Sequence, residues 1–577
     1  MNSKLSMRIT ALTFLAALAV PFQSAAQDEQ DRRPKHHTYN LVDLGTLGGP
    51  NSYIESLPPE SIINLRGAVV AYADTSVVDP FCVIDCFVNH AFVWKDGGRT
   101  DLGALAGGAS SFASAINARG EIAGASGNGK IDPLTAYPEF IAVRWKNGTI
   151  DSLGTLGGNQ SVANVISDRS QMAGAALNAI PDPFANITMP GCGFTFAQCF
   201  LFVPAATQAH AFRWTEAGGM QDLGALGGPD SSASFVNLRG QVAGEFFTSF
   251  TPNSSTGVPS VDPFFWEKGK MVDIGTLGGT FGYPFWMNNR GQVVGDSNLT
   301  GDQATHAFLW DKKEGLKDLG TLGGSVSNAN WINDGGEIVG GSNTPSDSEY
   351  HPFLSKNGVM TDLGTVAGDR CAGANSINSQ GQIVGFGSAD CNNEDHAFLS
   401  ENGGPIMDLQ SLVQPGSDLT LINAVFINDR GEIAARAKLS NGDEHAVVLI
   451  PCDEHHPGIE GCDYSLVDTA AATRKSPASF MTTAPRIPTL NGPSKAIRKR
   501  LPWPAKSETL DGYCLQPGYP GPGCRLTSDP THCPVGQRAK NPGVTSCGES
   551  GPIYVDGASR CAFKRGASLG ECEVTRP

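Results

Sequence analysis

Apolar residues occur along most of the chain in short runs, separated by polar turns that are rich in glycine. One such stretch reads Gly291-Gln292-Val293-Val294-Gly295, and another reads His306-Ala307-Phe308-Leu309-Trp310. Short runs of β-branched and aromatic residues bounded by turn signals predict strands rather than helices. The content of 70 glycines and 37 prolines agrees with many strands joined by tight turns. The chain is therefore predicted to be all-β.

One phrase, Asp-Leu-Gly-Thr-Leu-Gly-Gly with small variations, recurs along the first part of the chain. Its second residue falls at Leu44, Leu102, Leu153, Leu223, Ile274, Leu319, Leu363 and Leu409. The later copies are spaced by about 45 residues, a repeat length typical of propeller blades, and the earlier copies carry insertions.

Each repeat contains four strand-like pieces, which we name A to D. Strand A runs into an Asn-x-x-Gly sequence, as in Phe426–Gly431, and strand B follows at once. Asn with Gly three residues later suits a tight turn ending in a left-handed residue, so A and B form a hairpin. Strand C (His306–Trp310) and strand D (Gly358–Gly364 in another repeat) form a second hairpin. Four antiparallel strands per repeat predict a β-propeller of eight blades, or of seven if one divergent copy forms no blade.

The two ends of the repeat region complement each other. The region begins with a D strand, Tyr39–Gly45, and ends after a C strand, His445–Ile450. We expect the N-terminal strand to complete the last blade, because such closure protects the sheet edges of a ring.

Units such as His306–Trp310 followed by Asp318–Gly324 resemble the extracellular HAF-repeat proteins of bacteria over roughly residues 39 to 451. This resemblance implies export and a repeat body, and it brings no activity with it. Three units depart from the pattern, at Ile141–Val143, Asp262–Phe264 and His445–Val447.

Insertions fall in the B–C connections of the first four repeats and are longest around residues 175–209. Because strands alternate in direction, the B–C and D–A connections leave one face of the ring and the A–B and C–D turns leave the other. Inserted loops often form the binding face of repeat proteins. Three of these inserts share an Asp-Pro motif, and the candidate binding residues are Asp79, Phe81, Asp132, Asp182 and Phe184.

The 14 cysteines fall into even groups, which favours structural disulfides in an oxidising compartment over zinc sites. The candidate pairs are Cys82 with Cys86, Cys192 with Cys199, Cys371 with Cys391 and Cys452 with Cys462. The third pair tests the strand order, since its Cα atoms must lie within about 7 Å.

The N-terminal residues suggest export. A positive start, an apolar core and small residues before Gln27 predict a signal peptide. The expected divisions are a signal peptide (1–26), a linker (27–38), the propeller (39–451), a Cys452/Cys462 loop with a Pro-rich basic linker (452–510) and a Cys-rich module (511–577). The last has 15 possible pairings of its six cysteines. We expect a secreted, extracellular protein, free or attached to the envelope, without a transmembrane segment after signal cleavage.

The sequence contains no clear catalytic motif. The repeated histidines, such as His90 and His306, lie on separate blades and are expected to bind backbone or a nearby acid such as Asp101 or Asp318. The recurring tryptophans are expected to pack in the core. Asp453–His456 could hold a metal, but a solvated polar loop is favoured. We predict no catalytic residue, no metal site and no cofactor.

These observations predict a monomeric recognition protein that binds a polysaccharide, an envelope component or a protein through the face that bears the inserts. The net charge of −16 opposes binding to nucleic acid. The alternative is an extracellular glycan hydrolase or lyase with acids at the central channel, and a third possibility is a structural role in the envelope.

Overall fold

The Asn-x-x-Gly sequence of each repeat forms the predicted tight turn. In the second repeat, the N–H of Gly120 donates to the carbonyl of Asn117 at 2.9 Å. Gly120 has a φ of 82°, a left-handed conformation that costs glycine little. The Asn117 side-chain oxygen accepts the N–H groups of Arg119 and Glu121, at 3.0 and 2.9 Å. The Asn side chain thus fixes the turn, and strands A and B leave it as a hairpin.

The computed structural model describes residues 35–54, 61–81, 86–187, 189, 195–201, 203–254, 256–366, 368–391, 393–414 and 416–468, and the short strands at 544–545, 553–554, 560–563 and 572–575.

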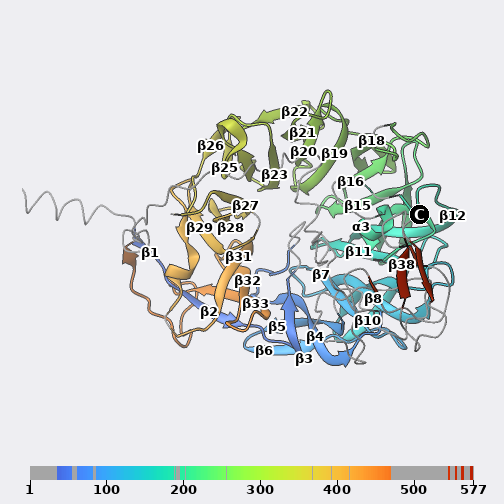
Figure 1. The fold of residues 1–577 in the computed structure, drawn as a ribbon. Coiled ribbons are helices and arrows are strands. Elements are labelled where there is room, and N and C mark those ends of the chain that lie inside the picture. Colours follow the sequence, from blue (N-terminus) through green and yellow to red (C-terminus); the bar gives the residue numbers. More distant parts are fainter. Residues whose placement is uncertain are drawn as a thin grey trace, which may run out of the picture.

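Within these residues, antiparallel pairing groups the strands of the repeat region into eight units of four, which we call blades 1 to 8. In Figure 1 the units stand around a ring, with A strands such as β7, β15 and β27 towards its middle. Single parallel bridges, such as Val261 with Phe281, link two pairs of neighbouring blades. The fold is a β-propeller, as predicted.

Blades 1 to 3 contain the longest B strands, of 10 residues each, whereas that of blade 4 has six. Blade 1 comprises β3 (Gly48–Tyr53), β4 (Val69–Val78), β5 (Phe87–Lys95) and β6 (Gly98–Asp101). Blade 2 comprises β7 (Ser111–Ile116), β8 (Ile122–Ile131), β9 (Pro138–Lys146) and β10 (Thr149–Gly154). Blade 3 comprises β11 (Ser161–Ile166), β12 (Met172–Pro181), β13 (Thr207–Thr215) and β14 (Gly219–Gly224), with helix α3 (Phe196–Leu201) in its insert. Blade 4 comprises β15 (Ser231–Val236), β16 (Val242–Phe247), β17 (Val261–Glu267) and β18 (Lys270–Asp273).

The B strands of blades 5 to 8, like that of blade 4, are shorter than those of blades 1 to 3. Blade 5 comprises β19 (Gly278–Met287), β20 (Val293–Leu299), β21 (Thr305–Asp311) and β22 (Gly315–Gly320). Blade 6 comprises β23 (Ser327–Ile332), β24 (Ile338–Asn343), β25 (Tyr350–Lys356) and β26 (Val359–Asp362), with the 3-10 helix η1 (Pro345–Asp347). Blade 7 comprises β27 (Cys371–Ile377), β28 (Gln382–Ser388), β29 (His396–Glu401) and β30 (Met407–Asp408), followed by η2 (Leu409–Leu412). Blade 8 comprises β31 (Thr420–Ile427), β32 (Ile433–Lys438), β33 (Glu444–Pro451) and β2 (Tyr39–Asp43).

The N-terminal strand closes the ring as expected. Strand β2 pairs with β33 in antiparallel register, and Asp43 lies opposite Val447. Figure 1 shows β2 beside β33 although the two strands are at opposite ends of the repeat region.

A circuit of asparagine side chains links the A–B turns of neighbouring blades. Asn64 donates to the carbonyl of Asn117 at 3.0 Å, Asn288 to Asn333 at 3.1 Å, and Asn428 back to Asn64 at 3.2 Å. Asn117, Asn237, Asn333 and Asn378 make the equivalent bonds. Blade 3 has Ser167 at this position, which lacks the amide donor. These buried bonds tie seven of the eight blades to the next one and restrain the length of their A–B turns.

Outside the ring, the short strand β1 (Lys35–His36) pairs with β34 (Val467–Asp468). Further along the chain, a small antiparallel sheet has the order β35-β38-β37-β36. Its strands are β35 (Val544–Thr545), β36 (Ile553–Tyr554), β37 (Arg560–Phe563) and β38 (Cys572–Thr575). The disulfide pairing predicted within residues 511–577 lies outside the described residues, as does the signal peptide. No helix among the residues described is long and apolar enough to cross a membrane.

Candidate functional site: the insert face

Three long hairpins rise from one face of the ring, which we call the insert face. Strands β4, β8 and β12 each have 10 residues, whereas the B strands of blades 4 to 8 have six or seven. The last residues of each long strand are exposed. The hairpins therefore extend beyond the body of blades 1 to 3.

An Asp-Pro turn follows each long strand, and its aspartate caps the turn. The Asp79, Asp132 and Asp182 carboxylates accept the N–H groups of the residues two positions on, at 2.9, 2.9 and 2.8 Å. Asp79 and Asp132 are buried. These three predicted binding residues hold the shape of the inserts, an Asx-turn role that the Asp-Pro sequence itself suggests.

The predicted aromatic residues also face inwards. Phe184 is buried, and Phe81 is partly buried against the same hydrophobic cluster. Tyr137 of the blade 2 insert and Val258 of the blade 4 insert join this cluster, together with Phe196 from α3. The inserts of four consecutive blades thus share one apolar core.

The exposed apolar residues of the hairpins are different ones, which sequence reasoning missed. Val77, Val78, Ile131, Leu134 and Ile180 all have large exposed fractions, 67% for Val78 and 72% for Leu134. They lie within two residues of the three Asp-Pro motifs. Apolar residues beside such a turn signal are the feature of the sequence that could have indicated these exposed side chains. Each of the three hairpin tips of blades 1 to 3 therefore exposes aliphatic side chains on the insert face.

A pair of carboxyl groups lies at the base of the blade 3 insert. The N–H of Asp182 donates to the carbonyl of Ala206 at 3.1 Å and closes this loop. Burial raises the pKa of Asp182 and, together with the charge of Asp182, raises the pKa of Asp230 well above the usual range. The two carboxyls therefore retain a proton between them under conditions where exposed aspartates are ionised.

Aromatic side chains meet at the axis of the ring near the A–B turns. Trp286 of blade 5 stacks on Trp331 of blade 6 with centroids 3.6 Å apart. Trp331 also contacts Phe426 of blade 8 at 5.3 Å, although blade 7 lies between them in sequence. Such a contact requires both side chains to project past blade 7 towards the axis. The predicted core role of Trp331 is confirmed, since it is 7% exposed.

Acidic side chains behind the A–B turns are neutralised by cations. Glu121 lies 3.0 Å from Lys146, and Glu337 lies 2.6 Å from Lys356. Glutamates at this position hold the turns and bind a neighbouring lysine.

The repeated histidines bind aspartates, as predicted. Nδ1 of His90 lies 3.0 Å from a carboxylate oxygen of Asp101, and Nδ1 of His306 lies 2.9 Å from one of Asp318. The same pair occurs as His210 with Asp222, His351 with Asp362, and His445 with Asp43. The last pair joins the two ends of the repeat region across blade 8.

Blade 4 replaces the histidine of this pair with an acid. The strand register places Asp262 opposite the segment that carries Asp273, as His306 stands opposite Asp318. Burial, together with the negative charge of Asp273 and a hydrogen bond to it, raises the pKa of Asp262 to about 7. The blade is therefore held by a carboxylic acid–carboxylate pair, which loses its proton near neutral pH.

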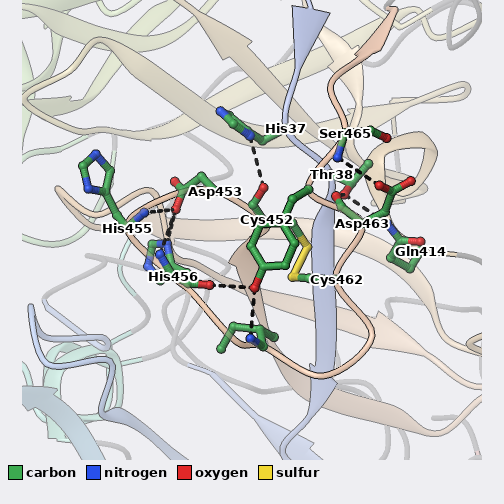
Figure 2. Close-up of a disulfide and its surroundings, with 12 residues drawn as sticks. His37, Thr38, Gln414, Cys452, Asp453, His455, His456, Cys462, Asp463 and Ser465 are labelled. Carbon is green, nitrogen blue, oxygen red and sulfur yellow. Dashed lines mark hydrogen bonds and ion pairs between the residues drawn. A yellow bond between two sulfur atoms is a disulfide. The ribbon is translucent and has the colours of Figure 1, made fainter.

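The two ends of the repeat region form a clasp on the opposite face, which we call the turn face (Figure 2). The N–H of Cys452 donates to the carbonyl of Thr38 at 2.8 Å, and a ring nitrogen of His37 lies 3.1 Å from the carbonyl of Cys452. The hydroxyl of Thr38 donates to the carbonyl of Asp463 at 2.8 Å. Residues 35–38, expected to be linker, are thus fixed to the ring.

The Cys452–Cys462 disulfide closes this clasp, and its loop is more ordered than the solvated loop expected from sequence. His456 is 4% exposed, with Nδ1 2.7 Å from Asp453 and Nε2 3.3 Å from Glu432. His455 points into solvent. Among the residues described, no group of three metal-ligating side chains converges, here or elsewhere.

The other cysteine predictions have different outcomes. Cys371 and Cys391 form a disulfide with their Cα atoms 5.1 Å apart, which confirms both the pair and the strand order. Cys86 and Cys199 are disulfide-bonded, while Cys82 and Cys192 lie outside the described residues.

Comparisons with known proteins returned distant fold neighbours. No protein-family model and no curated protein matches the chain. The β-propeller domain of the trilobed protease from Pyrococcus furiosus is 10% identical, with a TM-score of 0.34 over 65% of this chain and 96% of that one. Porphyromonas gingivalis dipeptidyl peptidase 4 is 9% identical, with a TM-score of 0.36 over 65% of this chain and 57% of that one. A PL25 ulvan lyase is 11% identical, with a TM-score of 0.25 over 62% and 79%. The assignment of the fold rests on the strand pairing described above.

Proposed function

We propose that this protein is a secreted recognition protein of the HAF-repeat type, which binds a polymer or protein partner through its insert face. The observation that carries the proposal is the exposed aliphatic surface at the three hairpin tips. Exposed apolar side chains gathered on one face mark interaction sites more often than scattered ones do.

The rigidity of the inserts supports the same role. Their shared core and capped turns hold the tips in place, so little conformational entropy is lost when a partner binds. The side chains at the tips are valine, isoleucine and leucine, which pack well against apolar protein surfaces. Sugar rings are bound more often by aromatic faces, so a protein partner is favoured over a neutral glycan.

The proposal is tested by capture of envelope components with the mature protein. We expect Val78→Asp and Leu134→Asp to reduce capture at least about tenfold, because each places a charge in the contact. Val359→Asp is the matched control, since Val359 is 64% exposed in a C–D hairpin on the turn face. Equal loss in all three variants would contradict the role of the insert face.

The same supernatants test the alternative of an extracellular glycan hydrolase or lyase. They are assayed for soluble sugar products after incubation with insoluble polysaccharides. Retention of the protein without products supports recognition. Released products would contradict the proposal and would direct attention to the carboxyl pair of Asp182 and Asp230.

A further inference from the structure

Six of the eight A–B turns carry arginine as their third residue. These turns connect the innermost strand of each blade to the next strand, so they surround the axis on the turn face. Five of the arginines are exposed and Arg430 is half-buried. We name this set the arginine ring: Arg66, Arg119, Arg169, Arg239, Arg290 and Arg430.

Four of the guanidinium groups are held in place by the neighbouring turn. Arg239 donates to the carbonyl of Arg290 at 3.4 Å, Arg290 to Gly335 at 3.5 Å, and Arg430 to Leu65 at 3.4 Å. Arg119 makes the same contact with Asp168. A guanidinium has five N–H donors, so most donors of the ring remain for a ligand.

The other two arginines are the least constrained. Within the described part of the chain, the structure records no hydrogen bond or ion pair for the side chains of Arg66 and Arg169. Their substitution should therefore disturb the fold little.

Carboxylates at the same turns do not cancel this charge. Asp168, Asp334 and Asp429 each accept a backbone N–H of the preceding blade's turn, at 2.7, 2.8 and 2.8 Å. Arg430 also lies 3.5 Å from Glu432. Six arginines against three aspartates and this glutamate still leave a positive ring on a protein whose net charge is −16.

A cleft of about 440 Å³ adjoins the ring beside blades 7 and 8. Arg430 lines it at one side, and His36, His37 and His455 of the clasp also line it. Three carboxylates also line it: Asp429, Asp453 and Glu401, which lies 2.7 Å from Nδ1 of His36. With three carboxylates beside one arginine, the cleft adds no positive charge to the arginine ring.

We propose that the arginine ring binds an acidic polysaccharide through its carboxylate or sulfate groups. Guanidinium groups fit such oxyanions with paired hydrogen bonds. Single-stranded nucleic acid is bound on exposed aromatic platforms, whereas Trp331 behind the ring is buried against Trp286 and Phe426. Duplex DNA carries one charge about every 1.7 Å, so an acidic protein repels it more strongly than a less densely charged glycan.

The test measures retention on immobilised polygalacturonate and dextran sulfate, with neutral dextran and duplex DNA as the other arms. We expect retention on the two acidic glycans, release by salt, and about tenfold weaker binding for Arg66→Gln/Arg169→Gln. Selective retention on one of the two glycans identifies carboxylate or sulfate as the preferred anion. The charge-retaining variant Arg66→Lys/Arg169→Lys should bind with intermediate affinity.

The matched control is Lys130→Gln/Lys438→Gln, which removes the same charge from two exposed residues at the ends of B strands on the insert face. Equal weakening by the control, equal retention on neutral dextran, or no retention on either glycan would overturn the proposal. Preferential binding of DNA through the ring would overturn it as well. Leu134→Asp should leave glycan retention unchanged, so this proposal and that for the insert face can fail separately.

Discussion

The two faces of the propeller are built from the same repeats, yet their connections differ in how far they vary. On the turn face, every A–B connection is a four-residue turn, from Asn64–Gly67 in blade 1 to Asn428–Gly431 in blade 8. On the insert face, the B–C connections range from short loops to the long blade 3 insert with helix α3.

The asparagine circuit explains this difference. A side chain that must reach the carbonyl of the next turn tolerates no change in turn length, because the carbonyl would move out of hydrogen-bonding range. B–C connections carry no such circuit and can lengthen at small entropic cost. The turn face therefore holds the ring together, while the insert face is free to acquire binding loops.

The largest expected effect comes from breaking the circuit on the turn face. Asn333 is buried, donates to the carbonyl of Asn378 at 3.1 Å and accepts the N–H of Glu337 at 2.9 Å. Asn333→Ala leaves both backbone groups without this partner. We expect it to lower the free energy of unfolding by about 3 kcal/mol, measured by urea denaturation.

An exposed polar residue on the insert face provides the control. Gln303→Ala should change the free energy of unfolding by less than about 0.5 kcal/mol. If the two variants were equally stable, the circuit would not be what distinguishes the two faces.

An intermediate effect is expected at the carboxyl pair of blade 4. Because the pKa of Asp262 is raised to about 7 in the folded protein, its stabilising contribution is present below pH 3.8 and is lost as the pH rises to about 7. Asp262→Asn keeps a neutral partner for Asp273 at all pH values. We expect it to stabilise the protein by about 2 kcal/mol at pH 8 and by almost nothing below pH 4.

The regular pair of blade 5 gives the opposite expectation. Asp318→Asn weakens the contact with His306 and should destabilise the protein at pH 5 as well as at pH 8. Thermal unfolding across this range measures both variants, and a gain of stability in Asp318→Asn would show that the His–Asp pair is not stabilising.

The repeat pattern predicted the fold because each strand boundary is marked locally. The Asn-x-x-Gly turns, the His–Asp pairs and the Cys371–Cys391 bridge all follow from residues at fixed offsets within one repeat. The bridge was predicted from strand order alone, since it joins the start of β27 to the following B–C loop.

The candidate site was harder to predict, because its side chains are defined by contacts between repeats. Asp132, a predicted binding residue, caps its own turn, while Leu134 beside it is exposed. The arginine ring was readable as a third-position arginine in six turns. Its significance required knowing that these turns meet around the axis.

The smallest expected effect distinguishes blade 8 from blade 6 on the turn face. Blade 6 pairs Glu337 with Lys356, whereas blade 8 pairs Glu432 with His456 from the clasp. Burial lowers the pKa of His456, but hydrogen bonds with Glu432 and Asp453 outweigh burial and the nearby Arg430, so that its pKa is raised above 6.5. The contribution of His456 is therefore present in full below pH 6.5 and is lost as the pH rises through the folded value.

We expect His456→Gln to cost about 1 kcal/mol at pH 5.5 and nothing above pH 9. Lys356→Gln should show a cost that is constant over this range, because its ion pair with Glu337 contains no histidine. Unfolding midpoints of both variants from pH 5.5 to 9 test this, and parallel curves would mean that the histidine gives the closing blade no pH dependence of its own.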